Sequence, residues 1–203
     1  KSASNWHYTH ESPPMSKLVA DILARTDNIV ADTVLRAIDI KEGGVGSFGS
    51  ASTTLTKFLT EFTGLPKRQW KVFDGSGLSH YTMVRPADLA RLLHLAYQDP
   101  KLYKQLNETL TKSGKDGTLG KRLKSPDMQG IFVAKTATLK YTSGIAGYLL
   151  RPDLDPLIVV MLINNAYHPT KDLRGWEDEW LLSLRYATLA ELRQGGQSVK
   201  IMP

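Results

Sequence analysis

Two hydrophobic patterns follow one another along this chain, and their order limits the fold more than any other feature. In roughly the first half, apolar side chains recur every three to four positions, which predicts helices over 16–26, 29–38, 51–63, 86–97 and 101–107. The last third contains β-branched runs between glycines and prolines, which predict strands over 131–134, 145–150 and 157–163. An amphipathic segment at 176–192 predicts a closing helix. This order predicts an α+β fold with antiparallel strands.

The composition is that of an ordinary globular protein. Of its 203 residues, 41% are hydrophobic and 23% are charged, and the absence of cysteine excludes disulfides and thiolate chemistry. The longest apolar run, 157–163, is far shorter than the roughly 20 residues of a transmembrane helix, so none is expected. The net charge of +6 favours anionic partners in general. However, the densest basic stretch, 112–124, contains no aromatic residue, so we interpret it as a solvated loop and expect no nucleic-acid binding.

Two local patterns resemble functional sites but lack an essential part. His7-x-x-His10 has the spacing of metal ligands on a helix, but prolines follow it and no further ligands converge, so we expect no metal and no cofactor. Gly75-Ser76-Gly77 suggests a nucleophile elbow, which requires glycines two residues on either side of the serine. Positions 74 and 78 are aspartate and leucine, so this stretch predicts a tight turn after a short strand at 71–73.

Two other segments are unremarkable alone and informative together. Thr26-Asp27-Asn28 lies between two expected helices, where Asp27 or Asn28 is an ordinary helix N-cap. Lys135-Thr136-Ala137-Thr138 lies at the end of the first expected strand. Penicillin-interacting serine enzymes combine the motifs Ser-x-x-Lys, Ser-x-Asn and Lys-Thr-Gly. A Ser-x-Asn-like turn followed by Lys-Thr-x on a strand matches the order and the setting of the last two.

Four blocks of sequence extend this match. In chain order they are Thr26–Thr33, Asp74–Ser79, Asp116–Leu119 and Ala134–Leu139, and they resemble the class C low-molecular-mass penicillin-binding proteins, the D-alanyl-D-alanine carboxypeptidase/endopeptidases. The resemblance covers about residues 16–192. Thr26 replaces the serine of the middle motif, Ala137 replaces the glycine of the last, and no serine has a lysine three residues later. Threonines at 54–57 and 109–112 have that spacing, but they follow the middle motif, and we interpret them as helix surface.

The resemblance implies a penicillin-binding/β-lactamase-like transpeptidase fold, in which helices flank an antiparallel sheet. It further implies a serine-type D-Ala-D-Ala carboxypeptidase of the bacterial periplasm, which cleaves peptidoglycan stem peptides through an acyl-serine intermediate and is inhibited by β-lactams. Lys135, Thr136 and Thr138 would then clamp the terminal carboxylate of a substrate that pairs along their strand. Asn28 would orient the substrate amide, and Thr26 would relay a proton to the leaving group. Ala137 would also line the substrate site, and its β-carbon is expected either to narrow the cleft or to rotate the peptide plane.

The missing Ser-x-x-Lys motif predicts that the chain is the C-terminal part of such an enzyme, with the nucleophile upstream of Lys1. We expect the chain alone to be inactive and to expose an apolar patch where the missing N-terminal segment docks. The expected divisions are an extended lead-in at 1–15, the catalytic part at 16–192 and a loosely held tail at 193–203. The alternative, favoured by Ala137 and by the absent motif, is a non-catalytic protein on the same fold that binds peptidoglycan or a partner.

Overall fold

The computed structural model describes residues 7–152 and 154–187 of the chain. Its helices are α1 (Met15–Arg25), α2 (Asn28–Lys41), α3 (Phe48–Thr63), α4 (Pro86–Gln98), α5 (Pro100–Thr109) and α6 (Thr170–Tyr186), with short 3₁₀ helices η1 (Lys67–Gln69) and η2 (Gly117–Leu119). Its strands are β1 (Thr111–Lys112), β2 (Phe132–Leu139), β3 (Thr142–Arg151) and β4 (Leu154–Ile163). The mixed composition and the antiparallel pairing of the strands confirm the predicted fold class.

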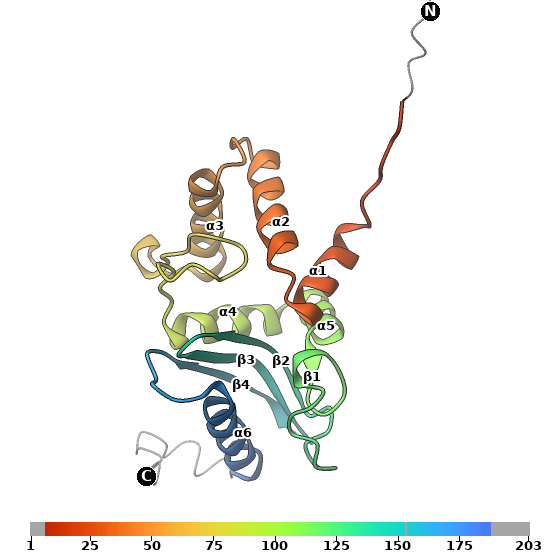
Figure 1. Cartoon of the computed structure of the whole chain (residues 1–203), viewed down its shortest axis with the longest axis vertical. Coiled ribbons are helices and arrows are strands. Elements are labelled where there is room, and N and C mark those ends of the chain that lie inside the picture. The colour runs from red at the N-terminus through yellow and green to blue at the C-terminus, as the bar shows by residue number, and fades with distance from the viewer. Residues whose placement is uncertain (1–6, 153, 188–203) are drawn as a thin grey trace, which may run out of the picture.

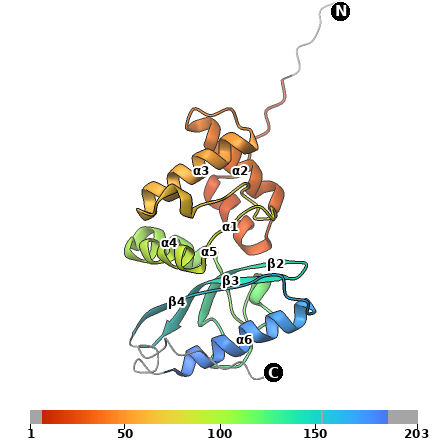
Figure 2. The ribbon, with the colours of Figure 1, turned by 90° about the vertical axis from the view of Figure 1, so that its left-hand side faces the viewer.

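The sheet lies between two helical layers (Figure 1). Figure 2 shows α6 against one face and α4 and α5 against the other, with α1, α2 and α3 beyond α4. Helix α1 packs against α5 and η2 as well as against α2. The junction between α1 and α2 is thereby brought next to β2, although more than a hundred residues separate them in the sequence.

The sheet leaves part of β2 open at its edge. The strand order is β1-β2-β3-β4, and β2 pairs with β3 along its whole length, from Phe132 opposite Leu149 to Leu139 opposite Thr142. The two-residue strand β1 covers only Val133 and Ala134 on the other side of β2. In the described parts of the chain, no strand covers that side from Lys135 to Leu139. The last motif therefore lies on an exposed strand edge.

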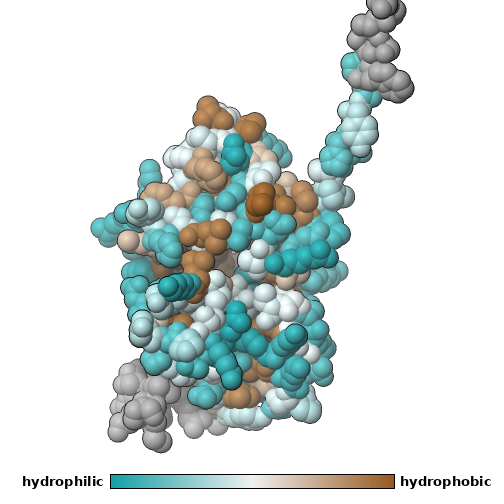
Figure 3. All heavy atoms as spheres, in the orientation of Figure 1, coloured by the Kyte–Doolittle hydropathy of each residue, from teal (hydrophilic) through white to brown (hydrophobic). Residues whose placement is uncertain are grey.

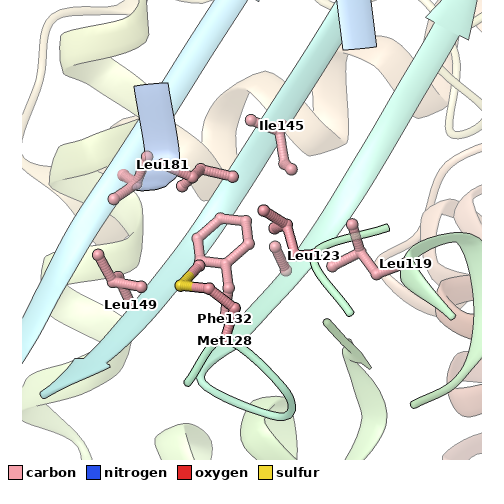
Figure 4. Close-up of a cluster of buried hydrophobic side chains, with 9 residues drawn as sticks. Leu119, Leu123, Met128, Phe132, Ile145, Leu149 and Leu181 are labelled. Carbon is pink, nitrogen blue, oxygen red and sulfur yellow. The ribbon is translucent and has the colours of Figure 1, made fainter. Parts of the chain in front are cut away.

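Alternate residues of β2 face different helical layers. Phe132 and Ala134 pack into a core between the sheet and α6 (Figure 4), together with Ile145, Leu149 and Leu181. The intervening Val133 packs on the opposite face with Tyr148 and Leu110, against α4 and α5. Because strand side chains alternate, Lys135 lies on the face of Val133, and Thr136 and Thr138 lie on the face of Ala134.

Several predicted boundaries differ from the structure. Helix α1 begins at Met15, one residue before the predicted start at 16, because the extended Pro14 precedes its first turn. The last helix begins at Thr170 rather than at 176, since Leu173 adds an earlier turn to its buried stripe, and it ends where Ala187 becomes extended. The strand predicted at 71–73 is only a single bridge from Lys71 to Met83. The predictions for 1–6 and 188–203 lie outside the described residues.

We expect Gly147→Ala to disrupt the centre of the sheet. A β-carbon at Gly147 would overlap the carbonyl oxygen of Val133 and lie 2.6 Å from Cα of Ala134, and both are backbone atoms of the paired strand. The expected loss is about 1–3 kcal/mol of unfolding free energy, at the upper end because the overlap is with backbone. Gly175→Ala in α6 is the matched control, because a β-carbon there meets no atom within 4 Å and alanine favours a helix. Equal stability of the two variants in chemical unfolding would contradict the expectation.

Candidate active site

The middle motif forms a sharp junction between two helices. Thr26 ends α1 in the left-handed conformation (φ 59°, ψ 54°), which is uncommon for a β-branched residue, and its N–H donates to Ile22 O. The Asp27 carboxylate accepts a hydrogen bond from Val30 N at 3.0 Å, which confirms it as the N-cap of α2. Helix α2 therefore starts at Asn28, and the junction leaves Thr26 exposed and Asn28 half-buried at the same corner of the molecule.

Lys135 connects this junction to the open edge of β2. Its Nζ donates to Thr26 Oγ1 at 2.7 Å and to the carbonyl oxygen of Thr136 at 2.7 Å. Desolvation by burial lowers the pKa of Lys135 below that of an ordinary lysine. Lys135 takes part in no ion pair among the residues that the structure describes. The structure thus joins the two predicted motif residues and leaves the third ammonium proton available for an anion.

Thr136 is fixed by hydrogen bonds that involve two further threonines, Thr118 and Thr111, which the sequence did not predict as site residues. Thr136 is 8% exposed, and its hydroxyl donates to Thr118 Oγ1 at 2.8 Å. Thr118 Oγ1 lies 3.5 Å from Thr111 Oγ1, and Thr111 donates to Ala134 O at 2.9 Å. The interpretation of Thr111 as helix surface is therefore wrong: it is buried on β1, because it binds the backbone of β2. Thr118 lies in one of the four blocks, but no local pattern assigned it a role.

The remaining predicted residues lie around the same edge. Ala137 and Thr138 are exposed at the open end of β2. Thr138 Oγ1 accepts a hydrogen bond from Nη2 of Arg174, a residue of α6 that the sequence interpretation did not single out. The side chain of Asn28 makes no hydrogen bond to the described residues, so its amide is available to a ligand. The structure therefore joins Thr26 to Lys135 directly, with Asn28 at the start of α2 and with Thr136, Ala137 and Thr138 following Lys135 along β2.

The segment Asp74–Ser79 packs beside α2 as a turn and is not a nucleophile elbow. The Asp32 carboxylate accepts from Gly75 N at 2.8 Å and from Ser76 N at 2.9 Å, which fixes the turn one helical turn beyond Asn28. Ser76 Oγ donates to Asp74 at 2.9 Å, so its hydroxyl is engaged within the turn. Across residues 7–152 and 154–187, no three His, Cys, Asp or Glu side chains cluster as metal ligands.

Comparisons with known proteins show which proteins the chain resembles in sequence and in fold. The chain is 29% identical over 169 residues to the D-alanyl-D-alanine carboxypeptidase DacB of Haemophilus influenzae, covering 82% of this chain and 34% of that protein. It is 23% identical over 163 residues to the D-alanyl-D-alanine carboxypeptidase of an Actinomadura species, covering 78% and 30%. The crystal structure of penicillin-binding protein 4 from H. influenzae matches with a TM-score of 0.77 and 27% identity, over 88% of this chain and 41% of that one.

The same comparisons define the extent and the fold of the match. The chain spans about a third of the length of the curated relatives. The TLA-3 extended-spectrum β-lactamase matches with a TM-score of 0.63 over 83% of this chain and 62% of that one, at 16% identity, which concerns the fold alone. The family model of the D-Ala-D-Ala carboxypeptidase 3 (S13) family matches residues 2–182, nearly the whole chain. The chain belongs to this family.

Proposed function

We propose that this chain forms the substrate-binding part of a serine-type D-Ala-D-Ala carboxypeptidase that acts on peptidoglycan stem peptides. The observation that carries the proposal is the 2.7 Å contact between Lys135 Nζ and Thr26 Oγ1, which links the middle and last motifs across 109 residues. Family membership and the named activity of the relatives support the reaction class. None of the comparisons supports the non-catalytic alternative.

The residues at the open edge of β2 and at the α1–α2 junction can bind, orient and protonate the groups that take part in an acyl transfer. The Lys135 ammonium binds the terminal carboxylate of the peptide, and the peptide backbone pairs with the open edge of β2. The free amide of Asn28 orients the substrate carbonyl group. A serine on a segment outside this chain attacks that carbonyl and the C–N bond breaks. The Thr26 hydroxyl passes its proton to the leaving amine of D-alanine and takes up the proton that the serine loses, and water then hydrolyses the acyl-serine to release the shortened peptide. Thr138 completes the carboxylate site. Thr136, which is buried and donates its hydroxyl proton to Thr118, supports the strand at this point, and Ala137 faces the paired peptide.

A groove between α2 and α3 is suited to contact the missing segment that is expected to carry the serine. It has a volume of about 430 Å³ between α2 and α3, and its apolar lining includes Leu35, Ile38, Leu55 and Phe58. Ile38 and Phe58 are exposed, and Figure 3 shows hydrophobic side chains gathered over this half of the molecule. We propose this groove as part of the surface that a further segment of the protein covers.

Localisation belongs to the same proposal. Because the similar proteins include a penicillin-binding protein of the bacterium H. influenzae, we propose a periplasmic location for the protein. None of the helices within 7–152 and 154–187 is both long and apolar enough to cross a membrane.

Labelling with a fluorescent penicillin tests the proposed function. The protein encoded by the entire reading frame is expected to become covalently labelled and to release D-alanine from a peptide that ends in D-Ala-D-Ala. The 203-residue chain alone is expected to remain unlabelled, because it contains no Ser-x-x-Lys. Labelling of the isolated chain would contradict the upstream nucleophile. An entire protein that is neither labelled nor active would contradict the proposed function itself.

A further inference from the structure

The C-terminal end of β2 lies against the beginning of α6. Here the side chain of Arg174 contacts the uncovered edge of β2, which is the proposed substrate edge. Arg174 Nη2 donates to Thr138 Oγ1 at 3.2 Å, and both side chains are exposed. Arg174 forms no ion pair with a carboxylate in the portion of the chain that the structure describes. Its guanidinium therefore has donors available for an anionic ligand.

The backbone that carries Arg174 is fixed by a partly buried network of hydrogen bonds and ion pairs. The carbonyl oxygen of Arg174 accepts from Arg122 Nη2 at 3.2 Å. Arg122 also binds Glu177 at 2.9 Å and Asp178 at 2.7 Å, one turn further along α6. This network attaches the first turns of α6 to the loop after η2. The Arg174 side chain thus projects from a rigid helix toward the substrate edge, and not from a free loop.

Lys135 alone offers few hydrogen bonds to a carboxylate at this edge, so a second cation can contribute to binding it. Two of the three Lys135 ammonium protons are already donated, to Thr26 and to the backbone of Thr136. A guanidinium keeps its charge at every physiological pH and matches a carboxylate with two parallel hydrogen bonds. Because Thr138 Oγ1 accepts from Arg174, its own proton remains available to an anion. Arg174 and Thr138 together present several donors at one end of the strand.

We propose that Arg174 binds the terminal carboxylate of the substrate together with Thr138, as a second cation beside Lys135. The inference rests on the proposed function and makes it more specific. It assigns the site to peptides and β-lactams with a free carboxylate, and it predicts discrimination against ligands in which that carboxylate is esterified or amidated. The discrimination arises because a neutral group leaves the guanidinium without its anionic partner.

The test compares two forms of one ligand on the entire protein. Rates of acylation by benzylpenicillin and by its methyl ester are measured for the wild type, Arg174→Ala and Arg174→Lys. We expect Arg174→Ala to lower the acylation efficiency of the free acid by about 10- to 100-fold and to change that of the ester little. Arg174→Lys is expected to be intermediate. Lys171→Ala, which removes an exposed cation one turn earlier on α6, is the matched control and is expected to resemble the wild type.

The outcomes separate this inference from the proposed function. An unchanged rate for the free acid in Arg174→Ala would overturn the role of Arg174, and so would an equal loss for acid and ester, which indicates a structural effect. If the wild-type protein is not acylated at all, the proposed function fails. In that case the dissociation constants of N-acetyl-D-Ala-D-Ala and of its C-terminal amide, measured by calorimetry, still test Arg174. A preference for the acid that disappears in Arg174→Ala would support the inference, and a preference that persists would overturn it.

Discussion

Lys135→Ala in the entire protein is expected to lower the efficiency of acylation by benzylpenicillin by about 100- to 1000-fold. The substitution removes a charge-assisted hydrogen bond to the substrate carboxylate and leaves Thr26 Oγ1 without its 2.7 Å donor. Thr26 then no longer has a fixed position for proton transfer. Stopped-flow acylation kinetics measure the effect. Lys140→Ala is the matched control, because Lys140 is an exposed lysine just after the same strand.

The pH dependence of Lys135 follows from its burial. Desolvation lowers the pKa of Lys135, so its ammonium loses a proton at a lower pH than an exposed lysine. The carboxylate site is therefore charged below this pKa, and its affinity falls as the pH rises through it. We expect KM for the peptide to rise on the alkaline side in the wild type. In Lys135→Arg, any residual activity is expected to lack this alkaline rise, because a guanidinium remains charged.

The lowered pKa of Lys135 has the opposite effect on folding stability: stability rises with pH where substrate affinity falls. Since the folded pKa of Lys135 lies below that of the unfolded chain, the unfolded state binds more protons between the two values, and stability rises with pH in that interval. At neutral pH the buried charge is a cost to folding. Lys135→Met is therefore expected to be inactive without a lower melting temperature. A variant that lost activity and folding together would contradict the assignment of Lys135 to substrate binding.

Most of the fold, and the α1–α2 junction of the site, follow from local sequence patterns. The change from helical to strand periodicity predicted the order of elements, and Asp27 had the chemistry of a helix N-cap, which the structure confirms. The order of the motifs, through the family resemblance, predicts Thr26 and Lys135 in one site. The structure brings these two side chains together, as the family pattern implies.

The residues that the sequence did not predict depend on contacts between distant segments. Thr111 and Thr118 look like loop or helix-surface residues, and only the path of β1 beside β2 makes them a support for Thr136. Arg174 lies on an exposed helical face, and its position at Thr138 depends on how α6 crosses the sheet. Glu177 is a charged residue in the buried stripe between Leu173 and Leu181, and its partners lie in other elements. Periodicity cannot reveal such pairings.

Glu177→Ala is expected to destabilise the protein by about 3–5 kcal/mol, because it breaks a buried ion pair from one side. Glu177 is 0% exposed and accepts hydrogen bonds from Ser143 Oγ at 2.7 Å and from Arg122 Nη2 at 2.9 Å. Its removal leaves Arg122, which is also largely buried, with Asp178 as its one remaining charged partner among the described residues. Chemical unfolding measures the loss. The control is Asp21→Ala, which breaks the exposed Lys17–Asp21 pair and is expected to change stability little.

A double variant separates the contribution of the ion pair to stability from the loss of packing that Glu177→Ala causes. Glu177→Leu combined with Arg122→Met replaces both charges by apolar side chains of similar size, and we expect it to lose less stability than the sum of the two single variants. Strict additivity would show that the pair carries no coupling. The network also holds the α6 turn of Arg174 and the loop after η2. In the entire protein, Glu177→Ala is therefore expected to weaken binding of carboxylate-bearing β-lactams even at temperatures where it remains folded.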